Sequence, residues 1–258
     1  MFALLTSCRY KRPRGEFLAR NPFPRPYTLG FYFREKMRAI HQIAPDQPFR
    51  DILEVGGGQG GVTNLLYPDA QTVNLDFEPK YANSPVNQRP NVRFVPGRAE
   101  ELPFENESFD AVTMFDLLEH VPDHRSAAHE ALRVLRPGGY VMVSSPNEYW
   151  RFPYHGFMAK YCHEAKVIAE WGHVRRGYCI RDLEELFELP CLRYLTFINS
   201  ITSISHDVAW STLSERRRRV LCTALGPLTW FGYLVHRQHG VGTETATLWQ
   251  KPATAATA

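Results

Sequence analysis

The feature that most constrains this chain is a run of glycines that follows a short apolar segment. Residues 52–55 read Ile-Leu-Glu-Val, and four of the next five residues are glycine. This pattern predicts a buried strand ending in a turn whose backbone must approach a ligand closely. The exposed amides of that turn, and the helix that follows from Val62, suit a polar or anionic ligand. A second predicted strand ends at Asp76, about twenty residues after the first glycine, where a carboxylate can accept both hydroxyls of a ribose.

Two ligand classes fit these glycines. Gly56, Gly58 and Gly61 satisfy the dinucleotide pattern G-x-G-x-x-G. With Glu54 and Gly60, the same stretch resembles motif I of the class I S-adenosylmethionine-dependent methyltransferases, an acidic residue followed by x-G-x-G-x-G. Glu54 favours the second class, because a carboxylate just before the turn would repel a pyrophosphate but attract a ligand that carries an ammonium and a sulfonium.

Four later segments carry the same resemblance. Residues 97–104 are similar to the family's G-D-A-E-x-L-P-F segment along the adenine, although Arg98 stands where an Asp is usual. An arginine cannot accept a hydrogen bond from the adenine amino group, so backbone groups of Arg98 and Ala99 are expected to hold the ring. Residues 116–121 are similar to the family's L-E-H-V run, and residues 132–139 to motif III. Residues 171–178 resemble a G-H-V-R run of the type-11 branch.

The resemblance implies an α/β fold: a Rossmann-like, seven-stranded, mostly parallel sheet with helices on both faces and an antiparallel last strand pair. The chain of 258 residues is long enough for one such domain, and 44% hydrophobic residues is an ordinary globular composition. We expect the methyltransferase domain over residues 28–251, with an acceptor lid at 146–179 and a helical insertion at 199–243. A basic, proline-rich arm (1–27) precedes it, and a disordered tail (252–258) follows.

The resemblance also implies S-adenosyl-L-methionine as the cofactor and a set of residues that bind it. The expected cofactor-binding residues are Glu54, Gly56, Gly57, Gly58, Gly60, Asp76, Phe77, Arg98, Ala99, Glu100, Met114 and Phe115. If the acceptor must lose a proton, the chain offers one carboxylate and several histidines near the expected lid and strand ends. The candidates for this catalytic role are His155, His173, His120 and Asp116.

The cysteines and the net charge limit which cellular compartment and which partners fit this chain. The five cysteines are odd in number and contain no C-x-x-C, which favours free thiols in a reducing, cytoplasmic compartment. Cysteines and histidines at 162, 163, 173 and 179 match no zinc spacing, so we expect no metal. The net charge of +3, without a basic stripe that carries stacking aromatic residues, argues against nucleic acid as a partner.

The insertion gives the one sequence hint about the acceptor. Four arginines at 216–219 precede the apolar, aromatic stretch 220–235. This arrangement suits an interfacial helix with peripheral membrane contact, or a lipid-linked acceptor. A helical cover packed on the domain, with a small-molecule acceptor, is the simpler alternative. The sequence leaves the oligomeric state open.

Two other functions fit part of the pattern. A nicotinamide-dependent oxidoreductase shares the glycines and Asp76 but does not explain Glu54 or the 97–104 segment. A non-catalytic, cofactor-binding partner subunit is the other alternative, because Arg98 departs from the pattern of the active family.

Overall fold

Seven strands form one sheet in the order β3-β2-β1-β4-β5-β7-β6. The computed structural model describes residues 10–22, 29–237 and 240–253. Strands β1 to β5 run parallel, and β7 lies antiparallel between β5 and β6. The expected fold class is therefore confirmed. The strands are β1 (Asp51–Val55), β2 (Gln71–Asp76), β3 (Val92–Pro96), β4 (Phe109–Phe115), β5 (Leu135–Pro146), β6 (Arg193–Phe197) and β7 (Glu244–Gln250).

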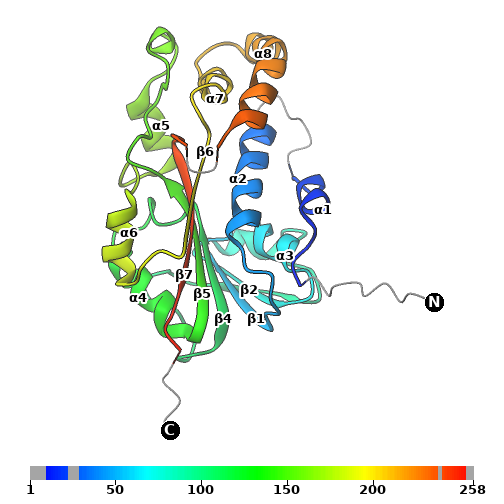
Figure 1. Cartoon of the computed structure of the whole chain (residues 1–258), viewed down its shortest axis with the longest axis vertical. Coiled ribbons are helices and arrows are strands. Elements are labelled where there is room, and N and C mark those ends of the chain that lie inside the picture. Colours follow the sequence, from blue (N-terminus) through cyan, green and yellow to red (C-terminus); the bar gives the residue numbers. More distant parts are fainter. Residues whose placement is uncertain (1–9, 23–28, 238–239, 254–258) are drawn as a thin grey trace, which may run out of the picture.

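Helices cover both faces of this sheet, as Figure 1 shows. The α-helices are α1 (Arg14–Ala19), α2 (Leu29–Ile43), α3 (Val62–Leu66), α4 (His124–Val134), α5 (Glu164–Trp171), α6 (Ile180–Phe187), α7 (Ser203–Trp210) and α8 (Glu215–Val235). Two short 3-10 helices lie at Pro79–Asn83 (η1) and Gly156–Met158 (η2). In the part of the chain that the structure describes, no helix combines the length and hydropathy needed to cross a lipid bilayer.

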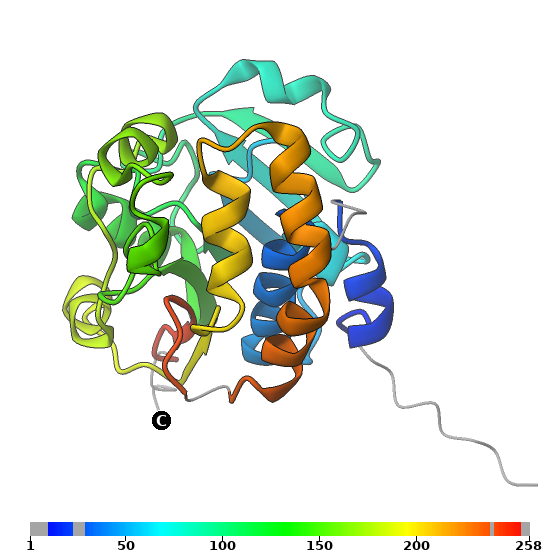
Figure 2. The same ribbon diagram turned by 90° about the horizontal axis from the view of Figure 1, so that it is seen from above.

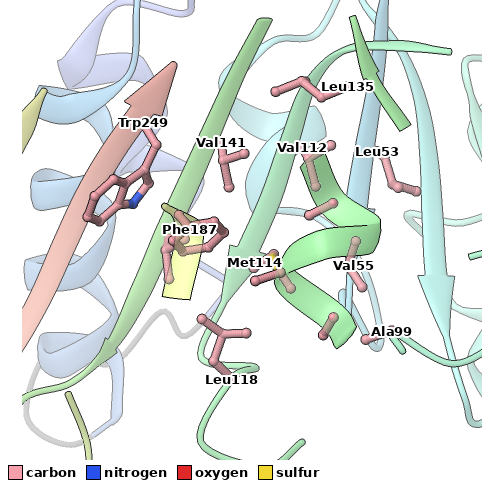
Figure 3. Packing of buried hydrophobic residues seen from close by; sticks show 14 of the residues in the cluster. Leu53, Val55, Ala99, Val112, Met114, Leu118, Leu135, Val141, Phe187 and Trp249 are labelled. Carbon is pink, nitrogen blue, oxygen red and sulfur yellow. The ribbon is translucent and has the colours of Figure 1, made fainter. Parts of the chain in front are cut away.

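Alternation along the strands divides the core into two layers. On β4, Val112 and Met114 face one cluster, which includes apolar residues of α4 and α6. Ala111, the residue before Val112, faces the opposite cluster, which includes residues of α1, α2 and α3. Because successive strand residues point to opposite faces, each strand serves both layers. Figure 3 shows the first layer, where Trp249 of β7 lies near Phe187 of α6 and the two rings stack 5.3 Å apart.

A third cluster joins the expected lid to the expected insertion. Trp150, Phe152 and Val167 of the lid pack with Val208 of α7 and Cys222 of α8. Figure 2 shows α7 and α8 lying beside one another and above α2. The two segments, which the sequence presents separately, therefore share one hydrophobic core over the end of the domain.

Part of the basic N-terminal segment has a structural role. Nζ of Lys11 donates hydrogen bonds to the carbonyls of His41 (3.0 Å) and Ala44 (2.6 Å), at the end of α2. Nε of Arg12 donates to the carbonyl of Leu65 (2.8 Å), at the end of α3. Cations at helix C-termini offset the negative end of the helix dipole, so these two charges fasten the segment to the domain. Much of the predicted arm and tail, residues 1–9, 23–28 and 254–258, lies outside the described residues.

Candidate functional site

The loop after β1 requires glycine for two separate reasons. Gly56, Gly58 and Gly60 have φ angles of +72°, +54° and +81°, a region that residues with side chains rarely adopt. Gly57 is needed for space, because a Cβ atom there would lie 2.2 Å from Oδ1 of Asn74. The loop therefore passes close to its neighbours and exposes backbone instead of side chains.

Glu54 lies beneath this loop. It is 4% exposed, and its Oε1 accepts a hydrogen bond from the backbone amide of Thr63 at 3.4 Å. Among the described residues, none donates to Oε2. Burial raises the pKa of Glu54 from 4.5 to about 7. A buried carboxylate oxygen without a partner is costly, and a cationic ligand at the loop would supply the missing charge and hydrogen bonds.

Asp76 is joined to the same loop. Its Oδ2 accepts from the amide of Gly58 at 2.9 Å, and its Oδ1 accepts from the amide of Glu78 at 3.0 Å. Each carboxylate oxygen has a second lone pair, so both remain able to accept from a diol. The two backbone bonds fix the carboxylate at the end of β2 before any ligand arrives.

A pocket of about 210 Å³, which we call the loop pocket, opens beside these groups. Phe77 stands in its wall with 71% of its surface exposed, which is unusual for a phenylalanine next to a buried strand. Nη2 of Arg98 lies 2.9 Å from Oε1 of Glu100, so the guanidinium turns toward that carboxylate. The lining residues are Val55, Gly56, Leu75, Asp76, Phe77, Gly97, Arg98, Ala99, Glu100, Leu117, His120, Val121 and Pro122.

A second pocket of about 300 Å³, the aromatic pocket, lies on the other side of His120. His120 belongs to the walls of both pockets. The other wall residues come from α2, the ends of β4 and β5, the lid, α7 and the start of β7. They are Tyr32, Asp116, Glu119, Pro146, Trp150, Trp171, His173, His206, Trp210 and Glu244.

A buried ion pair lies at the base of the aromatic pocket. Lys36 of α2 pairs with Asp116, which follows β4. Oγ of Ser144 donates to the other oxygen of Asp116 at 2.7 Å. Burial alone would raise the pKa of Asp116, but the charge and hydrogen bond of Lys36 lower it below its ordinary value. Asp116 also has a φ of +49°, a strained conformation of the kind that collects at functional sites.

Two further carboxyl groups in this pocket lack a matching cation. Glu119 and Glu244 are 1% and 2% exposed, and within the described residues neither Oε2 atom has a hydrogen-bond partner. Burial, reinforced by the negative charge of Asp116, raises the pKa of both groups well above the ordinary value. The pocket thus combines aromatic walls with carboxyl oxygens that can accept a hydrogen bond from a ligand.

His120 and His173 meet at the boundary between the two pockets. Their rings lie 4.7 Å apart, edge to face. Nδ1 of His120 lies 3.3 Å from the carbonyl of Gly172, which can only accept, so this nitrogen carries the proton and Nε2 keeps its lone pair. Burial lowers the pKa of His120, and it lowers that of His173 to about 4. Both imidazoles are therefore neutral near pH 7 and able to accept a proton.

Arg175 explains how the lid brings His173 to this position. Its guanidinium donates to the carbonyls of Leu118 (2.5 Å), Val121 (2.6 Å) and Pro122 (2.9 Å). These bonds fasten the Gly-His-Val-Arg run to the segment that follows β4. These bonds therefore hold His173 against the segment that carries His120.

Glu119, His120 and His173 also include the side-chain types that bind metal ions. One ligand atom from each lies within 4.8 Å of the others. Ligand atoms around a tetrahedral zinc ion lie about 3.3 Å apart, given bonds of about 2.0–2.1 Å. These side chains would have to close up considerably to hold such an ion.

Seven of the sequence-predicted site residues are outside the lining of both pockets. Four of them, Glu54, Gly57, Gly58 and Gly60, lie in the loop after β1 or beneath it, and the other three lie in the core or in a third pocket. Met114 is fully buried in the first core layer, among Val55, Leu118 and Phe187, as Figure 3 shows. Phe115 packs against the opposite layer. His155 lines a third pocket, of about 390 Å³, where its Nε2 lies 3.2 Å from Oγ of Ser203. The other three proposed catalytic residues all line the aromatic pocket.

Sequence reasoning missed several residues of the aromatic pocket. Lys36 lies on α2, eighty residues before its partner Asp116. Glu244 lies at the first position of β7, and Trp210 at the last position of α7. Only tertiary packing brings these residues together. The signal in the sequence that could have indicated Lys36 is its charge within the apolar face of α2.

The sheet order, the glycine loop after β1 and the acid at the end of β2 define the fold of a class I methyltransferase. Comparison with known proteins agrees: residues 53–143 match a family model described as a methyltransferase domain. The chain therefore carries a methyltransferase domain, related to S-adenosylmethionine-dependent methyltransferases.

Relatives of known or assigned function support this result. A probable S-adenosylmethionine-dependent methyltransferase of Mycobacterium tuberculosis is 32% identical over 118 residues, 45% of this chain and 43% of the relative. A phthiotriol/phenolphthiotriol dimycocerosates methyltransferase of Mycobacterium ulcerans is 40% identical over 162 residues, 59% of this chain and 53% of the relative. The chain thus spans about half the length of these curated relatives.

A solved structure shows the same fold over most of the chain. The N-methyltransferase NodS of Bradyrhizobium japonicum, in complex with S-adenosyl-L-homocysteine, superposes with a TM-score of 0.55. It is 14% identical, and the match covers 92% of this chain and 95% of that one. At this identity the likeness concerns the fold alone.

Proposed function

We propose that this chain is an S-adenosylmethionine-dependent methyltransferase acting on a small-molecule or lipid-like acceptor. The observation that carries the proposal is the position of His120 in the walls of both pockets. One pocket adjoins the glycine loop and Asp76, and the other has aromatic walls and buried acids. Two ligands bound side by side would meet at that histidine.

The groups around the loop pocket suit each part of the methyl donor. Glu54, with its unpartnered Oε2, suits the ammonium of the amino-acid end. Asp76 has a free lone pair on each oxygen for the ribose hydroxyls. An adenine ring stacked on Phe77 would cover its exposed face, and Glu100 offers a carboxylate at the same wall.

The aromatic pocket suits an amphiphilic acceptor. Trp150, Trp171 and Trp210 provide apolar walls, and Glu119 and Glu244 provide hydrogen-bonding groups for a polar head. The Mycobacterium ulcerans relative is, by name, a phthiotriol/phenolphthiotriol dimycocerosates methyltransferase. An acceptor with a polar nucleophile and an apolar body fits both observations.

S-adenosylmethionine supplies a methyl group already activated on a sulfonium. The chain has to align an O, N or C nucleophile with that methyl group and exclude water. When the nucleophile carries a proton, Nε2 of His120 is placed to receive it, since Nδ1 is held by the Gly172 carbonyl. The carbon–sulfur bond breaks as the bond to the nucleophile forms, so that S-adenosylhomocysteine and the methylated acceptor result.

Ligand titration tests the assignment directly. Isothermal calorimetry should detect S-adenosylhomocysteine binding and no binding of NADH. The reverse result would favour the oxidoreductase alternative and overturn the proposal. Binding of the cofactor product without methyl transfer to any member of a panel of amines, phenols, quinols and lipid-linked sugars would favour a non-catalytic partner subunit.

A further inference from the structure

We propose that the outer face of α8 docks on an anionic phospholipid bilayer. We define this outer face by the residues that share one exposed side of the helix: Arg216, Arg217, Val220, Leu221, Ala224, Pro227, Leu228, Phe231, Leu234 and Val235. The proposal does not depend on methyl transfer, because it concerns a surface outside both pockets.

An apolar stripe runs along this face. Leu234, Val220 and Phe231 are 71%, 61% and 55% exposed, and Val235 and Leu228 are close to half exposed. The positions 220, 224, 227, 231 and 234 follow the three- and four-residue spacing that lines one side of a helix. A contiguous exposed stripe differs from single exposed apolar residues, and it marks an interaction surface.

The opposite side of α8 already holds the helix on the domain. Its buried residues include Cys222, Gly226, Thr229 and Tyr233. Oγ1 of Thr229 shares a short hydrogen bond with Oγ of Ser205 on α7. A Cβ atom at Gly232 would lie 2.8 Å from Ile201, so the contact there is close. The packing of α8 is therefore complete without its outer face.

Two of the four arginines that begin α8 contact other residues of the fold, and the other two, Arg216 and Arg217, are exposed. Cations near a helix N-terminus oppose the helix dipole, so four of them in the first turn cost stability. Arg219 pairs with Glu215, and Arg218 donates to the carbonyl of Ala209 at 2.9 Å. In the part of the chain that the structure describes, Arg216 and Arg217 have no ion-pair partner. They lie on the same side as the stripe, one turn before Val220 and Leu221.

Charge complementarity favours a bilayer over a second copy of this chain. The outer face carries arginines and no acidic residue, so the same face of a second copy offers these arginines no complementary charge, whereas anionic headgroups do. An interfacial helix combines Lys or Arg with Phe, Leu and Trp, and it buries only its apolar face. At about 1.5 Å per residue, the 21 residues of α8 would lie along roughly 30 Å of membrane surface.

The position of α8 connects this surface to the aromatic pocket. Helix α7, which supplies His206 and Trp210 to the pocket wall, packs along α8, and Figure 2 shows the two helices side by side. A bilayer against the outer face would therefore lie next to the helices that enclose the pocket.

Vesicle co-sedimentation of the full chain tests the proposal. We expect binding to vesicles of phosphatidylcholine mixed with phosphatidylglycerol, weaker binding to phosphatidylcholine alone, and release by salt at about 0.5 M. Arg216→Gln with Arg217→Gln should weaken binding by about 25-fold, at roughly fivefold per arginine. Phe231→Ser with Leu234→Ser should weaken it at least tenfold.

Matched variants elsewhere on the surface serve as controls. Arg93→Gln with Arg125→Gln removes the same charge from exposed sites on β3 and α4, and Leu192→Ser removes an exposed leucine before β6. These variants should bind vesicles as the wild type does. All variants should stay folded, with a melting temperature no lower than a few degrees below that of the wild type, and should keep their affinity for S-adenosylhomocysteine, which separates this test from that of the proposed function.

Three outcomes would overturn the proposal. The first is a wild-type chain that stays in the supernatant with anionic vesicles. The second is equal loss of binding in the control and α8 variants. The third is a dimer by analytical ultracentrifugation that Phe231→Ser converts to a monomer, which would assign the outer face to a second copy.

Discussion

The backbone amide of Gly58 donates a hydrogen bond of 2.9 Å to Oδ2 of Asp76. This bond joins the loop after β1 to the acid at the end of β2. The two features, which the sequence presents eighteen residues apart, act as one unit in the structure. A change at Asp76 therefore removes a ligand contact and also releases the loop.

We expect Asp76→Ala to weaken S-adenosylhomocysteine binding by about 10²-fold or more, since hydrogen bonds to a charged group contribute about 1.5–3 kcal/mol each. Asp76→Asn keeps one acceptor oxygen and should lose less. Calorimetry measures both affinities. Unchanged binding in the alanine variant would show that the ribose lies elsewhere.

The raised pKa of Glu54 predicts pH-dependent cofactor binding. Burial raises this pKa to about 7, so the carboxyl group is largely protonated at pH 6 in the free chain. A cationic ligand prefers the ionised form, so binding at low pH requires proton release, and affinity should rise up to tenfold per pH unit until pH 7. Above that pH the dependence should level off.

Calorimetry at pH 6 and 7.5 in buffers of different ionisation enthalpy checks both the affinity and the released proton. The Glu54→Gln variant supplies the control, because it cannot ionise and should bind weakly at both pH values. A wild-type affinity that does not change between these pH values would show that Glu54 does not contribute to ligand binding.

Glu35 of α2 predicts a pH effect on stability. It is 1% exposed, its Oε2 accepts from the amide of Ile198 at 2.9 Å, and burial raises its pKa from 4.5 to about 7. The folded state therefore holds the proton more tightly than the unfolded state. Stability falls as pH rises from 4.5 to 7, by about 3 kcal/mol from this group.

Glu35→Gln keeps an acceptor for the Ile198 amide and removes the ionisation. We expect the variant to be more stable than the wild type at pH 8 and similar to it at pH 5. Urea unfolding at both pH values gives the two free energies of unfolding. A variant that is less stable at both would show that the carboxyl group is ionised and needed in the fold.

Substitutions of His120 and His155 should have very different effects on turnover. With an acceptor that the wild-type chain methylates through a protonated nucleophile, His120→Asn should lower kcat by about 10²–10⁴-fold, the range for loss of a general base. His155→Asn should change kcat by less than about threefold, because His155 lines the third pocket. An equal effect of both variants would contradict the assignment of Nε2 of His120 as the proton acceptor.

The features that depend on residues close together in the chain were predicted most accurately from the sequence. The glycine loop, Asp76 and all seven strands follow from local patterns, because backbone conformation at glycine and alternation in strands depend on neighbouring residues. Met114 was expected to face a ligand because it lies near the end of β4. The pleat instead turns it into the core, where it is fully buried.

The acceptor side was less predictable because distant elements build it. Lys36 reaches Asp116 from α2, and Glu244 arrives at the start of the last strand, after the long insertion. No local spacing relates these residues. Their proximity depends on how α2 and β7 pack against the carboxyl ends of the central strands.

The place of His120 in two pocket walls has a thermodynamic consequence. A ligand that rotates or orders this imidazole in one pocket changes the surface that the other ligand meets. Free-energy coupling between two binding events is reciprocal, so any factor by which the first alters the affinity of the second applies equally in reverse. A departing demethylated donor and an arriving acceptor would thus influence one another's residence time through a single shared side chain.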